Sequence, residues 1–190
     1  FTSRAEYRIL LRQDNADLRL TARGFDIGLA SKESMVKVEE KITGTTGIKK
    51  SLRKIGISPS MANIVLEKKG SAPIKQQVKL SSLITRPNIG IRDIISMTDQ
   101  LDEVITDLGE QKSDVLDQVE IQLKYEGYIT REEDVANKMT RLESLRLPGD
   151  LDYSKFSSLS TEATQKLNDI QPATIGQASR ISGVSPSDIS

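Results

Sequence analysis

The feature that most constrains the fold is a stretch of helical spacing between residues 113 and 145. Its apolar positions recur three or four residues apart, which places them on one face of an α-helix. Ser113 is a suitable N-cap, and Pro148-Gly149 ends the run. The stretch predicts one long helix over 114–145, or two helices stacked end to end near Gly127. The apolar positions are Val115, Leu116, Val119, Leu123, Val135, Met139, Leu142 and Leu145.

Most of the remaining chain also has helical signals. Ser31 is a plausible N-cap, and Gly44 predicts the end of the helix that it begins. The segment from Thr21 to Gly28 contains two glycines and predicts a turn. No apolar–polar alternation typical of a strand extends beyond about four residues. The predicted fold class is therefore all-α, with a multi-helix domain over residues 1–147 and a small helical module over the Ser- and Pro-rich residues 148–190.

The chain contains neither cysteine nor histidine. Thiol nucleophiles, disulfides, Ser-His triads and most zinc sites are therefore excluded. We predict no catalytic residue and no metal ligand, because the remaining side chains suit binding better than chemistry. No run of about 18 apolar residues occurs, so the sequence predicts no membrane span.

Charge is divided unevenly along a chain whose net charge is zero. Residues 1–80 contain 16 Lys and Arg against 8 Asp and Glu, whereas residues 81–190 contain 11 against 19. A basic half followed by an acidic half suggests two different partners, with any polyanion bound by the first half. Equally, the two halves could face each other across a domain interface.

Four arginines near the start form the first candidate anion-binding surface. Arg4, Arg8 and Arg12 recur every four residues, which would align them along one stripe of a helix, and Arg19 follows. Arginine offers a planar donor fork that matches phosphate or carboxylate. The alternative is a solvated helix face, whose arginines pair with nearby acidic residues. The chain also begins on Phe1, which suggests a start inside a larger fold.

A second basic cluster consists of Lys49, Lys50, Arg53 and Lys54, opposite the apolar positions of a short predicted helix. Such a cluster could contact a nucleic-acid backbone, and binding would then depend strongly on salt. The alternative is again a solvated helix face.

Two tyrosines lie three residues apart beside Gly127. We expect Tyr125 and Tyr128 to pack in the core with their hydroxyls at its edge, rather than to stack on bases.

The spacing of Ser179, Gly183 and Ile189 is that of a helix-turn-helix. Its second helix would present Ser187 and Asp188 where DNA binding needs basic residues. The segment is therefore interpreted as a structural turn, with a DNA-binding or purely structural interaction module as the alternative function.

Separated blocks of the chain, in the right order, resemble the MnmG family, also called GidA (glucose-inhibited division protein A). The resemblance is least clear over residues 31–75 and 98–113. The matching blocks are FTSRAEYR (1–8), RQDNADLRLT (12–21), LITRP (83–87), VEIQLKYEGYI (119–129) and PATIGQASRISGV (172–184).

The resemblance implies an enzymatic activity of a longer protein, of which this chain would be one part. These proteins are similar to FAD-dependent enzymes, with NAD a further cofactor, that modify carbon 5 of the tRNA wobble uridine together with the GTPase MnmE. It also implies a cytoplasmic homodimer and a heterotetramer with MnmE. FAD would bind upstream of this region, because no G-x-G-x-x-G follows a strand here. The fragment alone is therefore expected to be inactive.

The resemblance also assigns roles to residues. It implies that this C-terminal helical region binds tRNA and MnmE, and that one more apolar helix follows Ile189 in the family. Some of the opening arginines could instead hold the junction with the flavin domain. We predict tRNA contacts at Arg4, Arg8, Arg12, Arg19, Lys49, Lys50, Arg53 and Lys54. We predict the partner surface on residues 150–190, with contacts at Gln177, Arg180, Ile181 and Val184.

Overall fold

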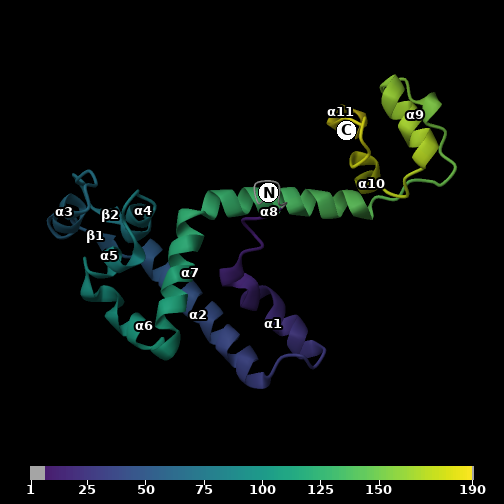
Figure 1. Cartoon of the computed structure of the whole chain (residues 1–190). Helices are drawn as coiled ribbons and strands as arrows, with labels where there is room; N and C mark the ends of the chain where they lie inside the picture. Colours follow the sequence, from purple (N-terminus) through teal and green to yellow (C-terminus); the bar gives the residue numbers. More distant parts are fainter. Residues whose placement is uncertain (1–6, 190) are drawn as a thin grey trace. The chain divides into compact units, whose positions relative to one another are not determined.

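A computed structural model of the chain describes residues 7–189, which divide into two compact units between Ile129 and Thr130. Both units are built of helices, and the only sheet in the described residues is one two-residue antiparallel pair (Figure 1). The predicted all-α class is confirmed. None of the helices between Tyr7 and Ile189 is both long enough and apolar enough to span a bilayer.

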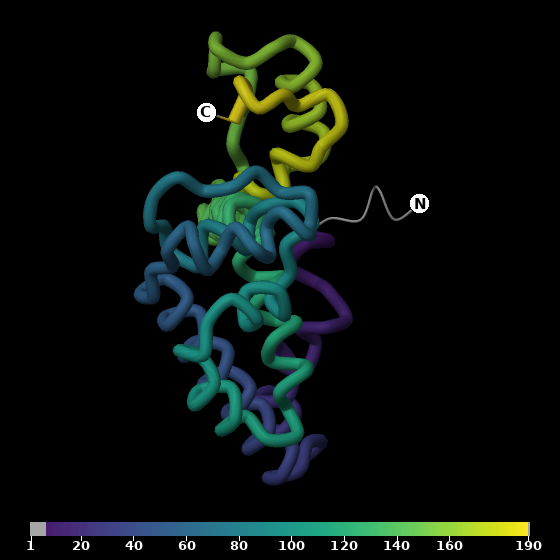
Figure 2. Tube along the Cα trace, turned by 90° about the vertical axis from the view of Figure 1, so that its left-hand side faces the viewer, coloured from purple at the N-terminus to yellow at the C-terminus, as the bar shows by residue number. Residues whose placement is uncertain are grey.

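Three helices give the first unit its frame. Helix α2 (Lys32–Lys54) contacts both α1 (Ala16–Asp26) and α7 (Lys112–Lys124), as Figures 1 and 2 show. The shorter elements lie between α2 and α7 in the sequence. They are β1 (Gly56–Ile57), α3 (Pro59–Lys68), β2 (Val78–Lys79), α4 (Leu80–Ile84), α5 (Ile91–Ile95) and α6 (Asp102–Thr106).

The core of the first unit collects apolar side chains from α2 through α7. Strand β1 pairs with β2 in the register Gly56 to Lys79, which joins segments more than twenty residues apart. All four apolar positions predicted on α7 are buried, because their spacing turns them to one face. The fully buried members of the core include Ile48, Leu52, Leu66, Leu80, Ile84, Ile91, Ile94, Leu101, Val115 and Val119.

Helix α2 begins as predicted but does not end as predicted. The Ser31 hydroxyl accepts a hydrogen bond from the Ser34 amide at 3.1 Å, so Ser31 is the N-cap. The predicted stop at Gly44 is wrong, because α2 continues to Lys54. A Cβ at Gly44 would lie 2.6 Å from Leu108 Cδ2. Gly44 therefore serves close packing rather than helix termination. Likewise α1 runs through Gly24, where a turn was predicted.

The two glycines of α2 should respond differently to alanine. A Cβ at Gly47 meets nothing within 4 Å, so Gly47→Ala should stabilise the chain by roughly 0.5–1 kcal/mol through helix propensity. In Gly44→Ala the same gain is opposed by the displacement of Leu108. Thermal unfolding followed by circular dichroism should therefore show a higher Tm for Gly47→Ala than for Gly44→Ala. Equal melting temperatures would contradict the packing role of Gly44.

The long apolar run forms two helices, which is the second of the two alternatives. Helix α7 ends at Lys124, and α8 spans Glu126–Ser144. Tyr125 lies between them with φ −105° and ψ 10°. Helix α8 contributes no buried side chain, and Val135 is 49% exposed. The apolar stripe predicted to continue along this helix is therefore not a core face.

The second unit has its own small core, built from Tyr153, Ala163, Leu167 and Ala178. Beyond α8 its helices are α9 (Thr161–Ile170), α10 (Ile175–Ser179) and α11 (Pro186–Ile189). The Ser160 hydroxyl caps α9 by accepting from the Ala163 amide at 3.1 Å. The boundary between the two compact units lies inside α8, between Ile129 and Thr130. The boundary at 147–148, drawn from composition, stays a prediction.

Candidate nucleic-acid interface

The opening arginines do not share a helix within the described residues. Arg4 lies outside those residues. Tyr7 to Leu10 form a turn in which Tyr7 has φ 54°, and Arg12 has extended backbone at φ −86° and ψ 157°. The predicted helical stripe is therefore wrong where the structure describes it, because helix α1 starts only at Ala16.

Two of these arginines form hydrogen bonds that organise their own segment. The Arg12 side chain is 19% exposed and donates to Asp14 Oδ1 at 3.0 Å and to the Ile9 carbonyl at 2.6 Å. The Arg19 Nε donates to Asn15 Oδ1 at 2.9 Å. Partial burial acts to raise the pKa of Asp14, but hydrogen bonds from Arg12 and Gln118 outweigh it and lower that pKa. Arg8 is exposed. Their contact with tRNA stays a prediction.

The second basic cluster lies at the C-terminal end of α2, beside the end of α7. Lys49 Nζ donates to Gln122 Oε1 at 3.0 Å, and Arg53 pairs with Glu126. The side chains of Lys50 and Lys54 are exposed.

The fold adds a fifth cation that spacing did not predict. Lys79 Nζ donates to the Lys54 carbonyl at 2.6 Å, because the β1–β2 pairing brings it there. No sequence signal connects residues 25 apart in this way. We call Lys49, Lys50, Arg53, Lys54 and Lys79 the α2 basic patch.

The two tyrosines are not in the core, so that prediction is wrong. Tyr125 is 47% exposed and Tyr128 is 63% exposed. Their ring centroids are 6.5 Å apart, with planes tilted by 55°. The break at Tyr125 ends the buried stripe of α7, so neither ring falls on its core face. The tyrosines flank Glu126, which places them next to the α2 basic patch.

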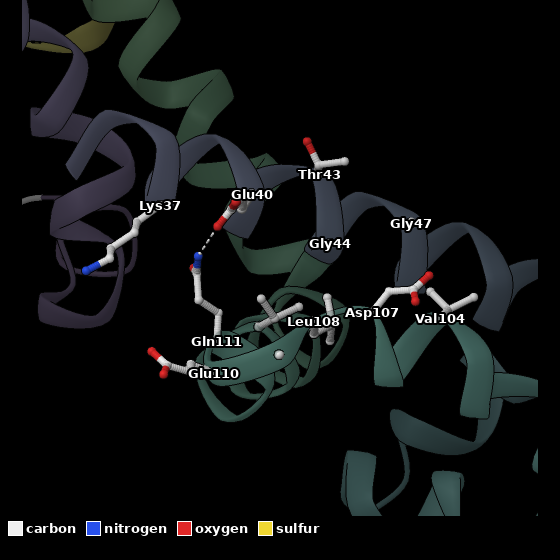
Figure 3. A pocket seen from close by; sticks show the side chains of 12 residues that line it. Lys37, Glu40, Thr43, Gly44, Gly47, Val104, Asp107, Leu108, Glu110 and Gln111 are labelled. Carbon is white, nitrogen blue, oxygen red and sulfur yellow. Dashed lines mark hydrogen bonds between the residues drawn. The ribbon is translucent and has the colours of Figure 1, made fainter. Parts of the chain in front are cut away.

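A groove of about 720 Å³ runs between α2 and the segment from Val104 to Gln111 (Figure 3). Its lining includes the carboxylates of Glu40, Asp107 and Glu110. Gln111 Nε2 donates to Glu40 Oε2 at 2.8 Å across it. Lys37 also lines the groove but pairs with Glu33 at 2.8 Å. Excess negative charge makes this groove unsuitable for a polyanion.

A second cavity collects four aspartates, Asp14 and Asp17 with Asp114 and Asp117. The Lys41 ammonium enters it, 9% exposed, and pairs with Asp17 at 2.8 Å. This internal cation offsets part of the negative charge. Among residues 7–189, no group of three acidic side chains is arranged to hold a metal ion.

The residues predicted to contact a protein partner lie on and after α10 in the second unit. Gln177 is exposed, and its Oε1 accepts from the Ala173 amide at 2.8 Å. Arg180 is exposed and pairs with Glu143 of α8. Ile181 and Val184 are half-buried against the small core. Partner binding by these four residues stays a prediction.

The helix-turn-helix spacing corresponds to α10, a turn and α11. Gly183 in that turn has φ 97°, and a Cβ there would collide with Glu162. Helix α11 has four residues, and its only charged one is Asp188. A helix this short and without a cation gives no surface for reading DNA, so the segment is a structural turn.

Asp188 joins the start of α9 to the start of α11. Its carboxylate accepts from the Ser160 amide at 2.9 Å, and from the Ser185 amide at 2.8 Å and hydroxyl at 2.6 Å. The Ser185 hydroxyl and these amides lower the pKa of Asp188 to about 2. The folded second unit therefore stabilises the ionised form of the Asp188 carboxylate.

This lowered pKa predicts acid sensitivity. Because the folded value lies below the ordinary 3.8, the stabilisation is complete above pH 4 and is lost as pH falls toward about 2. Melting curves between pH 5 and pH 2 should show a smaller loss of Tm in Asp188→Asn than in the unsubstituted chain. Asp150→Asn, an exposed carboxylate of the same unit, is the control and should behave like the unsubstituted chain. Identical profiles for all three would contradict the role of Asp188.

Comparison with known families gives two adjacent matches that together cover most of the chain. Residues 32–133 match the model described as the tRNA modifying enzyme MnmG/GidA C-terminal helical domain. Residues 135–190 match the model described as the C-terminal helical bundle of the same enzyme.

Individual relatives agree with the family models. Over its full length the chain is 48% identical to the tRNA uridine 5-carboxymethylaminomethyl modification enzyme MnmG of Christiangramia forsetii and 47% identical to that of Cytophaga hutchinsonii. It covers 30% of either relative. A solved structure of Aquifex aeolicus GidA is 35% identical with a TM-score of 0.58, over 98% of this chain and 28% of that one.

Proposed function

Because the chain belongs to the MnmG/GidA family of tRNA-modifying enzymes, as its C-terminal helical region, we propose that it binds tRNA and a protein partner for such an enzyme. The proposed reaction of the full-length protein is modification of carbon 5 of the wobble uridine, together with the GTPase MnmE. The proposed location is the cytoplasm, where tRNA is found. The proposed assembly is a homodimer that forms a heterotetramer with MnmE.

The α2 basic patch is the observation that supports tRNA binding. Five cations gather where α2 ends, and the side chains of Lys50 and Lys54 are exposed there. Lysine and arginine side chains on a surface neutralise phosphates and release the counterions that surround a nucleic acid. The acidic groove and the aspartate cavity of the same unit offer no comparable surface.

Catalysis is assigned to the part of the protein that this chain does not include. The chain spans about 30% of the length of its curated relatives. A dinucleotide site needs a parallel sheet with a Gly-rich turn leading into a helix, and residues 7–189 offer only a two-residue antiparallel pair. These residues do not fit FAD. We propose that FAD binds upstream in the full-length protein and that the fragment alone is inactive.

Titration of labelled tRNA with the 190-residue chain tests the proposed function. Affinity should fall steeply as salt rises, because binding depends on phosphate contacts. Arg8→Ala in the same assay tests the sequence prediction for the opening arginines. An absorbance spectrum of the purified chain tests the cofactor assignment. Absence of tRNA binding, or a visible flavin band, would contradict the corresponding part of the proposal.

A further inference from the structure

Two large aromatic rings are exposed beside the α2 basic patch. Tyr125 and Tyr128 stand at the junction of α7 and α8, 47% and 63% exposed. A Cβ at Gly127, between them in the sequence, would meet nothing within 4 Å. The space around the junction is therefore open, and neither ring belongs to the apolar core.

Two side-chain contacts place the rings next to the α2 basic patch. Arg53 pairs with Glu126, the residue that follows Tyr125. One turn earlier, Lys49 Nζ donates to Gln122 Oε1 at 3.0 Å. Both members of the Arg53–Glu126 pair are 51% exposed, and so exposed a pair contributes little stability. A phosphate can therefore compete with Glu126 for the Arg53 guanidinium.

We propose that Tyr125 and Tyr128 form a stacking platform for unpaired RNA bases, whose flanking phosphates bind the α2 basic patch. Proteins that bind single-stranded nucleic acid combine these two elements: aromatic faces on which bases stack and cations that follow the backbone. This inference deepens the proposed function and rests on it, since it names the part of the tRNA that the surface would hold.

The geometry favours unpaired bases over duplex RNA. Bases inside a helix are stacked on one another and offer no face to a side chain, whereas bases in loops can be splayed out. The ring planes are tilted by 55°, so they do not form a parallel slot for one base. Both rings are substantially exposed, so a different base can stack on each. The five cations of the patch favour an anionic partner, with Glu126 the carboxylate held among them.

Binding should be measured with a labelled single-stranded oligouridine and with a hairpin of equal length that is fully paired except for its tetraloop. Loss of one stacked ring weakens binding by roughly tenfold, so Tyr128→Ala should lose about that factor for oligouridine. Tyr128→Phe keeps the ring and should bind normally. Phe25→Ala is the matched control, since Phe25 is 42% exposed on α1, next to the opposite end of α2. It should leave the affinity unchanged.

Tyrosine fluorescence gives a second readout, because the chain has four tyrosines and no tryptophan. Oligouridine should quench this emission in the unsubstituted chain. The double variant Tyr125→Phe/Tyr128→Phe should bind oligouridine with nearly the same affinity, but its emission should be quenched less, because the two stacked tyrosines are gone. Two outcomes separate failure of the proposed function from failure of the stacking platform. If the unsubstituted chain binds no tRNA, the proposed function fails. If it binds tRNA but Tyr125→Ala/Tyr128→Ala binds oligouridine equally well, the stacking platform alone is overturned, and the rings are left for a protein partner.

Discussion

Reversing two charges of the α2 basic patch, in the variant Lys50→Glu/Lys54→Glu, should weaken tRNA binding more than any other pair of surface substitutions in the first unit. Both side chains are exposed. They are next in sequence to Lys49 and Arg53, which contact Gln122 and Glu126. Two unit charges about 4 Å apart in water interact by about 1 kcal/mol. Loss of two such contacts weakens binding roughly thirtyfold, and the added repulsion increases that factor.

The salt dependence should change together with the affinity. Each lost phosphate contact lowers the slope of log affinity against log salt by about 0.7–0.9, so the slope for the double variant should be smaller by about 1.4–1.8. Titrations of tRNA at several salt concentrations would measure both quantities. Removal of these side chains leaves the core intact, since neither is buried.

A matched control separates local contact from net charge. Lys32→Glu/Lys37→Glu makes the same charge change at the N-terminal end of α2, where both lysines are also exposed. At a rise of about 1.5 Å per residue the 23-residue helix is about 35 Å long, and Lys32 and Lys37 lie about 27 and 20 Å from Lys50 along its axis. The control should retain most of the affinity. Equal losses of affinity in the two variants would show that tRNA binding depends on the net charge of the chain and not on the α2 basic patch.

Deletion of residues 150–190 should abolish capture of MnmE by the chain in a pull-down. The deleted segment contains the short 3-10 helix Tyr153–Lys155 and helices α9, α10 and α11, and with them all four buried residues of the small core. The first unit has a separate core, so its fold should survive the deletion. Circular dichroism and tRNA binding of the deletion variant would verify that it does.

A surface variant tests the same partner site without removing the module. Gln177→Ala/Arg180→Ala changes two exposed side chains. It removes the exposed pair between Arg180 and Glu143, which is worth little, and the hydrogen bond from the Ala173 amide to Gln177 Oε1. Capture should be reduced in this variant and unchanged in the control Lys166→Ala, an exposed position on α9. Full capture by the deletion variant would exclude residues 150–190 as the partner surface.

Local signals in the sequence were sufficient for the fold class and for several element positions. The spacing of Val115, Leu116 and Val119 predicted the buried face of α7, because only a helix turns such positions to one side. Ser31 marked the start of α2 for an equally local reason, a side chain that caps its own helix. The resemblance to the MnmG family also depended on short blocks and agrees with the family models.

Predictions failed where a distant contact, or a helix start or break that periodicity does not show, decided the outcome. Gly44 was interpreted as a helix stop because nothing nearby in the sequence shows that Leu108 packs against it. Arg12 was placed on a helical stripe, but the fold holds it against Asp14 and the Ile9 carbonyl before α1 begins. Tyr125 and Tyr128 were expected in the core, but the helix break at Tyr125 leaves both rings exposed.

The sequence by itself determined the all-α class, the buried face of α7, the cap of α2 at Ser31 and the family that the chain resembles, since each of these depends on neighbours within one or two turns. It did not determine every helix boundary: Ser113, the predicted cap, lies inside α7, which begins at Lys112. Only the tertiary structure decided which cations share a surface and which aromatic rings lie beside them. Lys79 joins the α2 basic patch through the β1–β2 pairing, and Tyr125 adjoins it through the Arg53–Glu126 contact. Both depend on contacts between residues more than twenty positions apart, and no local periodicity encodes such contacts.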